Sequence, residues 1–154
     1  MSENQSKHKR DGYKGYTVHH SFGPYQIPVN IQNLILRDYA KQRGLLYKLG
    51  LNEFIFPHCY LRLESLLQEL PSLEGLLICS VFILPKNQKR RFQIYETIIQ
   101  EQTVLHVVFE NKIVESFNDV DQIEELILLT QTLDSCPKSI PSELLPSVKF
   151  TESF

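Results

Sequence analysis

Apolar and polar residues follow one another along this chain in blocks whose period alternates between that of a strand and that of a helix. The segment 76–82 is apolar except for Ser80, and a continuous apolar run of this length is typical of a strand buried on both faces of a parallel sheet. The segment 103–109 has the same character. In contrast, leucines recur three and four residues apart in the segment 60–70, which is the period of one helix face.

The same pattern, read along the whole chain, predicts a regular alternation of strands and helices. Strands are expected at 13–19, 45–49, 76–82 and 103–109, with 113–117 as a short edge strand, and helices at 28–44, 60–70, 89–100 and 119–133. Strands that alternate with helices at this pitch form right-handed βαβ units. The predicted fold is therefore α/β, with three layers: a mostly parallel sheet of four to five strands and helices on both faces.

Helical spacing also predicts which side chains face the sheet, and residue types predict where helices begin and end. Pro28 suits a first turn, Gly44 suits a C-terminal cap, and Asp119 is expected to cap the last helix. The apolar positions expected to share the inward faces of the first and third helices are Ile31, Leu34, Ile35 and Tyr39, and Phe92, Tyr95, Ile98 and Ile99, respectively.

With 154 residues, the chain has the length of one domain. We expect that domain to span residues 12–134. The polar segment 1–11 is predicted to be a disordered leader, and the segment 135–154, which contains Pro137, Pro141 and Pro146, is predicted to be an irregular tail.

Charge and cysteine content narrow the function classes. A net charge of -2 argues against electrostatic binding of nucleic acid by the domain as a whole. Three cysteines without C-x-x-C spacing argue against a disulfide framework or a zinc site, so neither a metal nor a cofactor is expected, and Cys59 and Cys79 are expected to be small buried side chains. No apolar h-region begins the chain and no apolar run reaches about 18 residues, so a cytoplasmic protein without a membrane partner is predicted.

Ligands of open α/β sheets bind beyond the carboxyl ends of the strands, which directs attention to residues 19–28, 50–59, 80–90 and 110–112. His19, His20 and Ser21 follow the first strand and precede a helix whose free N–H groups favour anions. His20 and Ser21 are the catalytic candidates, as a base and a nucleophile. The alternative is a structural role for one His and solvation of the other, because adjacent strand residues point to opposite faces.

Further candidates stand near the other strand ends. Arg62 lies in the first turn of a helix, where a cation opposes the helix dipole, so it indicates either an anionic ligand or a nearby carboxylate partner. Ser80 ends a buried strand and either faces a pocket or bonds the backbone. Glu110 follows another buried strand and is expected to pair with an arginine or a His.

A cluster of cations begins the third predicted helix, at the end least favourable for positive charge. It comprises Lys86, Lys89, Arg90 and Arg91. A site for phosphate or a polyanion and a solvated loop are both compatible with such a run. Arg90 and Arg91 are the two members expected nearest to a pocket.

The order of these segments resembles the catalytic domain of serine recombinases (resolvases) at the level of the fold. The resemblance rests on the Gly-Tyr strand, the Gln32-Asn33-Leu34 helix, the helix that begins Arg62-Leu63-Glu64 and the buried strand after it. That family needs a Ser at the end of strand one and an Arg two residues before it, and these positions fall on His20 and Val18. Its Asp-Arg-x-x-Arg cluster falls on 82–86, and Arg62 alone has a counterpart. The resemblance implies a resolvase-like or flavodoxin-like sheet order without the strand-exchange chemistry.

A second set of motifs resembles the sporadic carbohydrate cluster proteins, a small bacterial family. The motifs are Gly12-Tyr13-Lys14-Gly15-Tyr16, Ser21-Phe22, the helix from Val29 to Tyr39, Cys59-Tyr60 and Leu84-Pro85, within residues 12–130. This resemblance implies a setting of surface-carbohydrate biosynthesis and assigns no catalytic residue.

Three hypotheses follow. The first is a protein that binds an anionic sugar ligand, a sugar phosphate or a nucleotide sugar, at the strand ends. The second is a non-catalytic scaffold that forms a homodimer, because helix 119–133 is apolar on more than one side. The third, a recombinase-like nucleic-acid protein, is disfavoured by the net charge.

Overall fold

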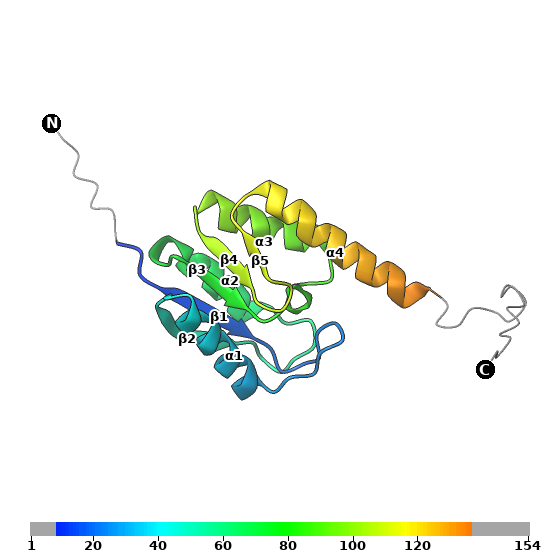
Figure 1. The fold of residues 1–154 in the computed structure, drawn as a ribbon, viewed down its shortest axis with the longest axis horizontal. Coiled ribbons are helices and arrows are strands. Elements are labelled where there is room, and N and C mark those ends of the chain that lie inside the picture. Colours follow the sequence, from blue (N-terminus) through cyan, green and yellow to red (C-terminus); the bar gives the residue numbers. More distant parts are fainter. Residues whose placement is uncertain (1–8, 137–154) are drawn as a thin grey trace, which may run out of the picture.

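The computed structural model describes residues 9–136, which form a five-stranded sheet flanked by helices (Figure 1). The elements are β1 (Tyr13–Thr17), α1 (Val29–Gln42), β2 (Tyr47–Asn52), α2 (Leu61–Glu69), β3 (Gly75–Ile78), α3 (Gln88–Gln100), β4 (Val104–Val107), β5 (Lys112–Val114) and α4 (Phe117–Ser135), with short 3₁₀ turns at Leu70–Ser72 and Val81–Ile83. The strand order is β2-β1-β3-β4-β5. All neighbouring strands are parallel except β5, which runs antiparallel to β4.

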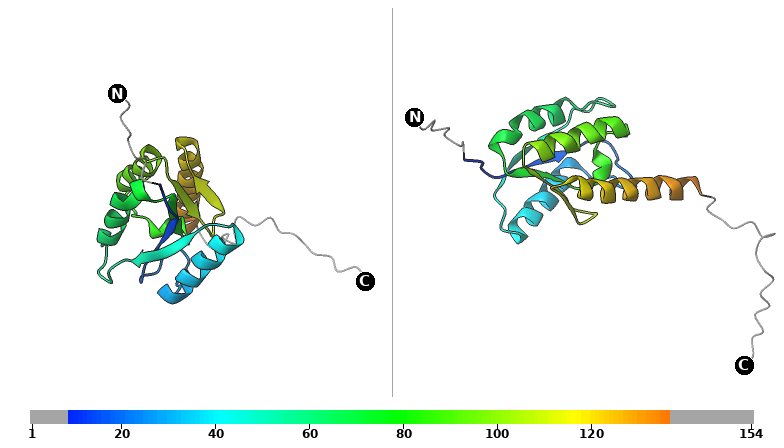
Figure 2. Two further views of the ribbon diagram at one scale, coloured as in Figure 1. Left: turned by 90° about the vertical axis from the view of Figure 1, so that its left-hand side faces the viewer. Right: turned by 90° about the horizontal axis from the view of Figure 1, so that it is seen from above.

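The sheet is covered on both faces, as the alternation of strands and helices predicted. Helix α1 lies on one face, and α2 and α3 lie on the other (Figure 2). Gly15 allows α1 to approach closely, because a Cβ at this position would lie 2.8 Å from Leu36 Cδ1. On the opposite face, the fully buried Tyr16 packs in the same core as Leu63 of α2. The predicted three-layer, mostly parallel α/β fold is confirmed.

Several predicted boundaries are wrong, and local hydrogen bonding explains the main cases. β3 ends at Ile78, because Ser80 accepts a hydrogen bond from the Phe82 backbone N–H and turns the apolar run into a 3₁₀ turn. β2 covers Tyr47–Asn52 rather than 45–49. α4 begins two residues before Asp119, which is the third residue of the helix and forms a capping box with the N-cap residue Ser116. The pKa of the Asp119 carboxyl is lowered mainly by the backbone N–H of Glu115.

The inward face of α1 also differs from the prediction. Ile31 and Leu34 are 41% and 56% exposed, whereas Gln32, Leu36 and Ala40 are buried. The Gln32 amide donates to the carbonyls of Val18 and Ile27 and accepts from the Val18 N–H, so its polar groups are satisfied inside the core. In α3, similarly, Arg91 and Ile94 are buried in place of Phe92. Polar side chains with internal partners thus override the apolar period.

Helix α4 is packed along its first half only. Val120, Ile123 and Ile127 are buried, whereas Leu128, Leu129 and Leu133 are about 60% exposed. Figures 1 and 2 show the C-terminal half of α4 extending beyond the rest of the domain. No helix within residues 9–136 is long and apolar enough to cross a membrane.

Candidate functional site

The crevice where ligands of such sheets usually bind is filled with aromatic side chains. In the order β2-β1-β3, the chain reverses direction across the sheet between β1 and β3, and the loops after these strands flank that crevice. Gly23 packs directly on Phe82, since a Cβ there would lie 2.7 Å from Phe82 Cδ2. Tyr25 stacks at 4.8 Å from the ring of Phe109 and contacts Phe22. The polar hollows described next lie to the sides of this plug.

The first hollow, here called the α3 hollow, has a volume of about 520 Å³ and is open to solvent. It lies between the loop before α2 and the first turn of α3. Its lining is His58, Tyr60, Pro85, Lys86, Asn87, Lys89, Arg90 and Gln93. Four of these side chains are basic, so the hollow is suited to an anion.

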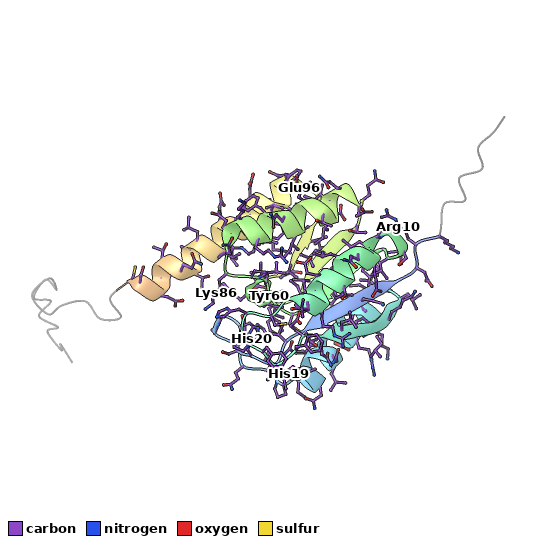
Figure 3. The ribbon with its side chains drawn as sticks, turned by 180° about the vertical axis from the view of Figure 1, so that it is seen from behind. Arg10, His19, His20, Tyr60, Lys86 and Glu96 are labelled. Carbon is purple, nitrogen blue, oxygen red and sulfur yellow. The ribbon has the colours of Figure 1, made fainter. Side chains whose placement is uncertain are left out.

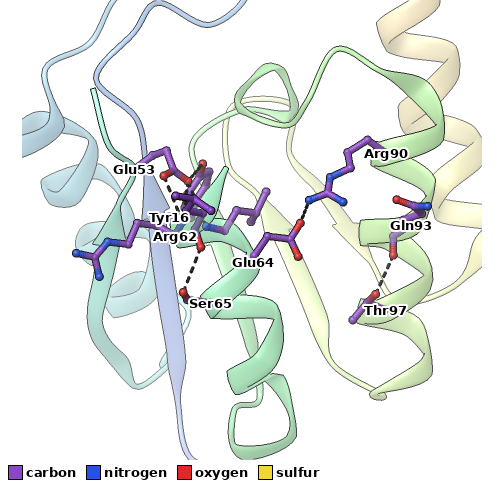
Figure 4. A network of polar contacts seen from close by, with 10 residues as sticks. Tyr16, Glu53, Arg62, Glu64, Ser65, Arg90, Gln93 and Thr97 are labelled. Carbon is purple, nitrogen blue, oxygen red and sulfur yellow. Dashed lines mark hydrogen bonds and ion pairs between the residues drawn. The ribbon is translucent and has the colours of Figure 1, made fainter. Parts of the chain in front are cut away.

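The start of α3 is built so that its cations gather there. The Asn87 side chain accepts from the Arg90 backbone N–H at 3.0 Å, which caps the helix directly after Lys86. The Arg90 guanidinium forms an ion pair with Glu64 of α2 (Figure 4). Within the described residues, Lys86 and Lys89 form no ion pair with a carboxylate. Two ammonium groups therefore stay available at the positive end of a helix dipole.

The second hollow, here called the α2 hollow, has a volume of about 540 Å³ and lies beside β2. His19, Asn52, Phe54 and Arg62 contribute its side chains together with the apolar residues Ile55 and Phe56. The Arg62 guanidinium lies over the Phe54 ring, 4.7 Å from its centroid, and is therefore held in place by a cation–π contact.

Glu53 is a residue of this region that sequence reasoning missed. It is 2% exposed, and its carboxylate accepts hydrogen bonds from the backbone N–H groups of Arg62 and Leu63 and from the Tyr16 hydroxyl (Figure 4). Burial and this carboxylate raise the pKa of Tyr16. Glu53 thus occupies the anion position at the N-terminus of α2. An acidic residue directly after a strand and shortly before a helix was the available signal.

Arg62 was predicted to face either an anionic ligand or a nearby carboxylate. Its backbone N–H donates to Glu53, whereas its side chain is exposed and, among the described residues, forms no ion pair with a carboxylate. His19, His20 and Ser21 are exposed in the loop that follows β1. Figure 3 shows His19 and His20 toward the end of the domain that holds Tyr60 and Lys86, away from Arg10. His20 Nδ1 lies 2.8 Å from the backbone carbonyl oxygen of Ser21. Among the contacts of the described residues, no His–Ser side-chain hydrogen bond joins the two catalytic candidates.

Three other predicted site residues are engaged inside the structure. Ser80 Oγ donates to Glu110 at 2.5 Å, so Glu110 pairs with a serine rather than with an arginine or a His. Glu110 also accepts from the Val81 N–H at 3.3 Å. Arg91 is 5% exposed and binds Glu124 of α4 together with the carbonyls of Pro85 and Lys86. These residues support the walls of the site and leave Arg90 as the candidate with an accessible guanidinium in the α3 hollow.

The surroundings of the cysteines do not favour a reactive thiol. Cys79 is buried, and burial raises the pKa of its thiol to about 12. Cys59 is half-buried and its thiol lies 3.6 Å from a Glu53 oxygen. In the part of the chain that the structure describes, His, Cys, Asp and Glu side chains do not form a cluster of three that could hold a metal ion.

Comparison with known proteins supports the fold and leaves the chemistry open. No protein-family model matches the sequence, and no curated protein matches it. Among solved structures, the chain is similar to the N-terminal catalytic domain of TP901-1 integrase, with a TM-score of 0.56 and 12% sequence identity. The match covers 79% of this chain and 96% of that chain. The fold-level resemblance to the serine recombinase catalytic domain is confirmed, and at this identity the likeness extends to the fold alone.

Proposed function

We propose that the protein binds a phosphate-bearing sugar, either a sugar phosphate or a nucleotide sugar, in the α3 hollow, and that it acts in bacterial surface-carbohydrate biosynthesis. The observation that supports this proposal is the convergence of His58, Lys86, Lys89 and Arg90 on one open hollow. Cations crowded at a helix N-terminus repel one another and the helix dipole, and a bound phosphate relieves both effects.

The lining also offers groups of the kind that hold a sugar. Lys86 and Lys89 supply ammonium donors for phosphate oxygens, and Arg90 supplies a guanidinium whose ion pair with Glu64 is solvent-exposed and therefore weak. Tyr60, Asn87 and Gln93 line the same hollow and present hydroxyl and amide groups to sugar hydroxyls. His20 and Ser21 belong to the loop that follows β1, at the same end of the sheet, and remain within the proposal as contributors from that loop.

Isothermal titration with glucose 1-phosphate, UDP-glucose and inorganic phosphate tests the proposal. We expect binding of at least one sugar ligand to weaken about tenfold in Lys89→Ala, since a charge-assisted hydrogen bond contributes roughly 1.5 kcal/mol. Lys41→Ala, at an exposed position near the end of α1, is the matched control and should bind as the unaltered chain does. Absence of binding by all three ligands, or equal weakening by both variants, would reject the proposal.

A homodimer is the second candidate role, and the exposed half of α4 favours it. Leu128, Leu129 and Leu133 stand on a stretch of helix that extends past the domain. A helix that is apolar on more than one side gains stability when a second subunit covers it. A nucleic-acid role has the least support, because the net charge is negative and the Ser and Arg positions of the recombinase pattern hold His20 and Val18.

A further inference from the structure

The loop between β2 and α2 presents three consecutive large apolar side chains to solvent. Phe54, Ile55 and Phe56 are 39%, 78% and 71% exposed, and Leu61, at the start of α2, is 64% exposed. Isolated exposed apolar residues are common, whereas three in succession on one loop are not required by packing. We call Phe54–Phe56 the apolar tip.

Two cations, Arg62 and Lys89, and two histidines flank the apolar tip. Arg62 and His19 line the α2 hollow together with the tip residues, and His58 follows the tip in the same loop. Lys89 lies in the neighbouring α3 hollow, which shares that loop as a wall. All four side chains belong to the same edge of the sheet.

Three carboxylates lie near this end of the sheet, and each has partners within the structure. Glu53 is buried and satisfied by backbone N–H groups and the Tyr16 hydroxyl. Glu64 is paired with Arg90, and Glu110 accepts from Ser80. Within the described residues, the exposed cations Arg62 and Lys89 form no ion pair with a carboxylate. This end of the sheet therefore combines exposed apolar side chains with exposed cations, which is the composition of surfaces that contact anionic membranes.

We propose that this edge docks onto an anionic phospholipid surface. The side chains of the apolar tip enter the boundary between headgroups and acyl chains, while Arg62, fixed over Phe54, and His19 face the headgroup phosphates. Such an interfacial contact does not require a membrane-spanning segment, so it is compatible with the absence of a spanning helix in residues 9–136. It also does not depend on the sugar ligand proposed above.

Charge complementarity and size favour a lipid surface over a protein partner. A stable protein interface buries at least about 1,200 Å² and spreads over 20 or more residues on each side. The tip offers three adjacent side chains on a loop flanked by cations. A lipid surface accepts a small apolar insertion because acyl chains rearrange around it, and anionic headgroups add a favourable contribution for each nearby Arg or Lys.

Vesicle sedimentation tests the inference with vesicles of phosphatidylcholine alone and of equal parts phosphatidylcholine and phosphatidylglycerol. The full chain should sediment with the mixed vesicles and not with the neutral ones. Ile55→Ser/Phe56→Ser should lower the partition coefficient at least tenfold, and Arg62→Gln about fivefold. Leu46→Ser removes a leucine that is 56% exposed just before β2, at the opposite end of the strand, and should leave partitioning unchanged.

Three results would overturn the inference: no sedimentation with mixed vesicles, equal sedimentation of the double variant and the unaltered chain, or a dimer that the double variant converts to a monomer. The last result would identify the tip as a contact between copies of the chain. Titration of the double variant with the sugar ligands keeps the two proposals separate, because the substituted residues line the α2 hollow and not the α3 hollow.

Discussion

The Arg91 guanidinium grips both carboxylate oxygens of Glu124, with Nε to Oε1 at 2.8 Å and Nη2 to Oε2 at 2.7 Å. The third guanidinium nitrogen, Nη1, donates to the carbonyls of Pro85 and Lys86. The Tyr95 hydroxyl donates to the same Glu124 carboxylate. The two ionic side chains are only 6% and 11% exposed. This network joins α4 to α3 and to the loop that forms the α3 hollow.

Removing the arginine from this network should be costly. In Arg91→Ala, the Glu124 carboxylate stays in a poorly solvated position without its cation, so the free energy of unfolding should fall by about 3 kcal/mol or more. Urea denaturation followed by circular dichroism measures the change.

Arg90→Ala is the matched control, one residue away. The ion pair of Arg90 with Glu64 has side chains 42% and 40% exposed, so its loss should change the free energy of unfolding by less than about 1 kcal/mol. Equal losses in the two variants would contradict the assignment of Arg91 as the buried anchor.

Glu53 should contribute to the free energy of unfolding, because its carboxylate binds the N-terminus of α2. Glu53→Ala leaves the Tyr16 hydroxyl and the backbone N–H groups of Phe54, Arg62 and Leu63 without their acceptor in a largely buried place, which should cost about 3 kcal/mol in the free energy of unfolding. Glu53→Gln keeps one acceptor oxygen and should cost less. Thermal and urea unfolding of both variants test this order, and an alanine variant as stable as the glutamine variant would refute it.

Stability should depend on pH through His106. This side chain lies against the Tyr39 hydroxyl, with Nδ1 at 2.8 Å, and near the Tyr13 ring, and burial lowers its pKa from the ordinary value of 6.5. Below pH 6.5 the unfolded chain therefore takes up a proton that the folded chain does not. Stability should decline as the pH falls through this window and level off below the folded-state pKa.

The slope contributed by this residue has an upper limit of about 1.4 kcal/mol per pH unit. Urea titrations at several pH values should show it in the unaltered chain and not in His106→Gln. Parallel pH profiles for the two chains would show that His106 does not carry the effect.

The dimer predicted from α4 is tested by light scattering at micromolar concentration. Leu129→Glu should shift a dimer to a monomer, because it places a charge on an apolar surface that the partner would cover. The fold of the variant should be unaffected, since Leu129 is 59% exposed. A monomer in the unaltered chain would remove this proposal.

The sequence pattern was most informative where side chains are uniformly apolar. The buried runs that became β3 and β4 predicted a parallel sheet, and four helices appear where their periods placed them. The pattern failed at Gln32 and Arg91, because a polar residue with internal partners cannot be distinguished from a surface residue without knowing those partners. β3 likewise ends before its predicted boundary, because the hydrogen bond that Ser80 accepts could not be seen in the sequence.

The sequence predicted the location of the candidate site better than it predicted which residues form it. The rule of carboxyl ends led to the segments that contain His19, His58 and Arg90, whereas Arg62 was found from its place in the first turn of a helix; the two hollows use these residues. His58 and Tyr60 were not singled out as candidates: His58 lies in an irregular apolar stretch, and Tyr60 was assigned to the start of the helix 60–70. The pairing of Ser80 with Glu110 joins residues 30 positions apart, and nothing in either local sequence announces it.

The tight contact between Gly23 and Phe82 has a consequence for related chains. Gly23 has a φ of +55°, and its missing Cβ leaves room for the aromatic ring, so the two positions share one fixed volume. A larger residue at 23 would meet the ring at 82 and would also strain a backbone of positive φ, so we expect glycine at 23 in homologues that keep an aromatic residue at 82. In a homologue that has lost the ring at 82, we expect the space between the loops that follow β1 and β3 to become vacant and to admit a small molecule at the centre of that end of the sheet.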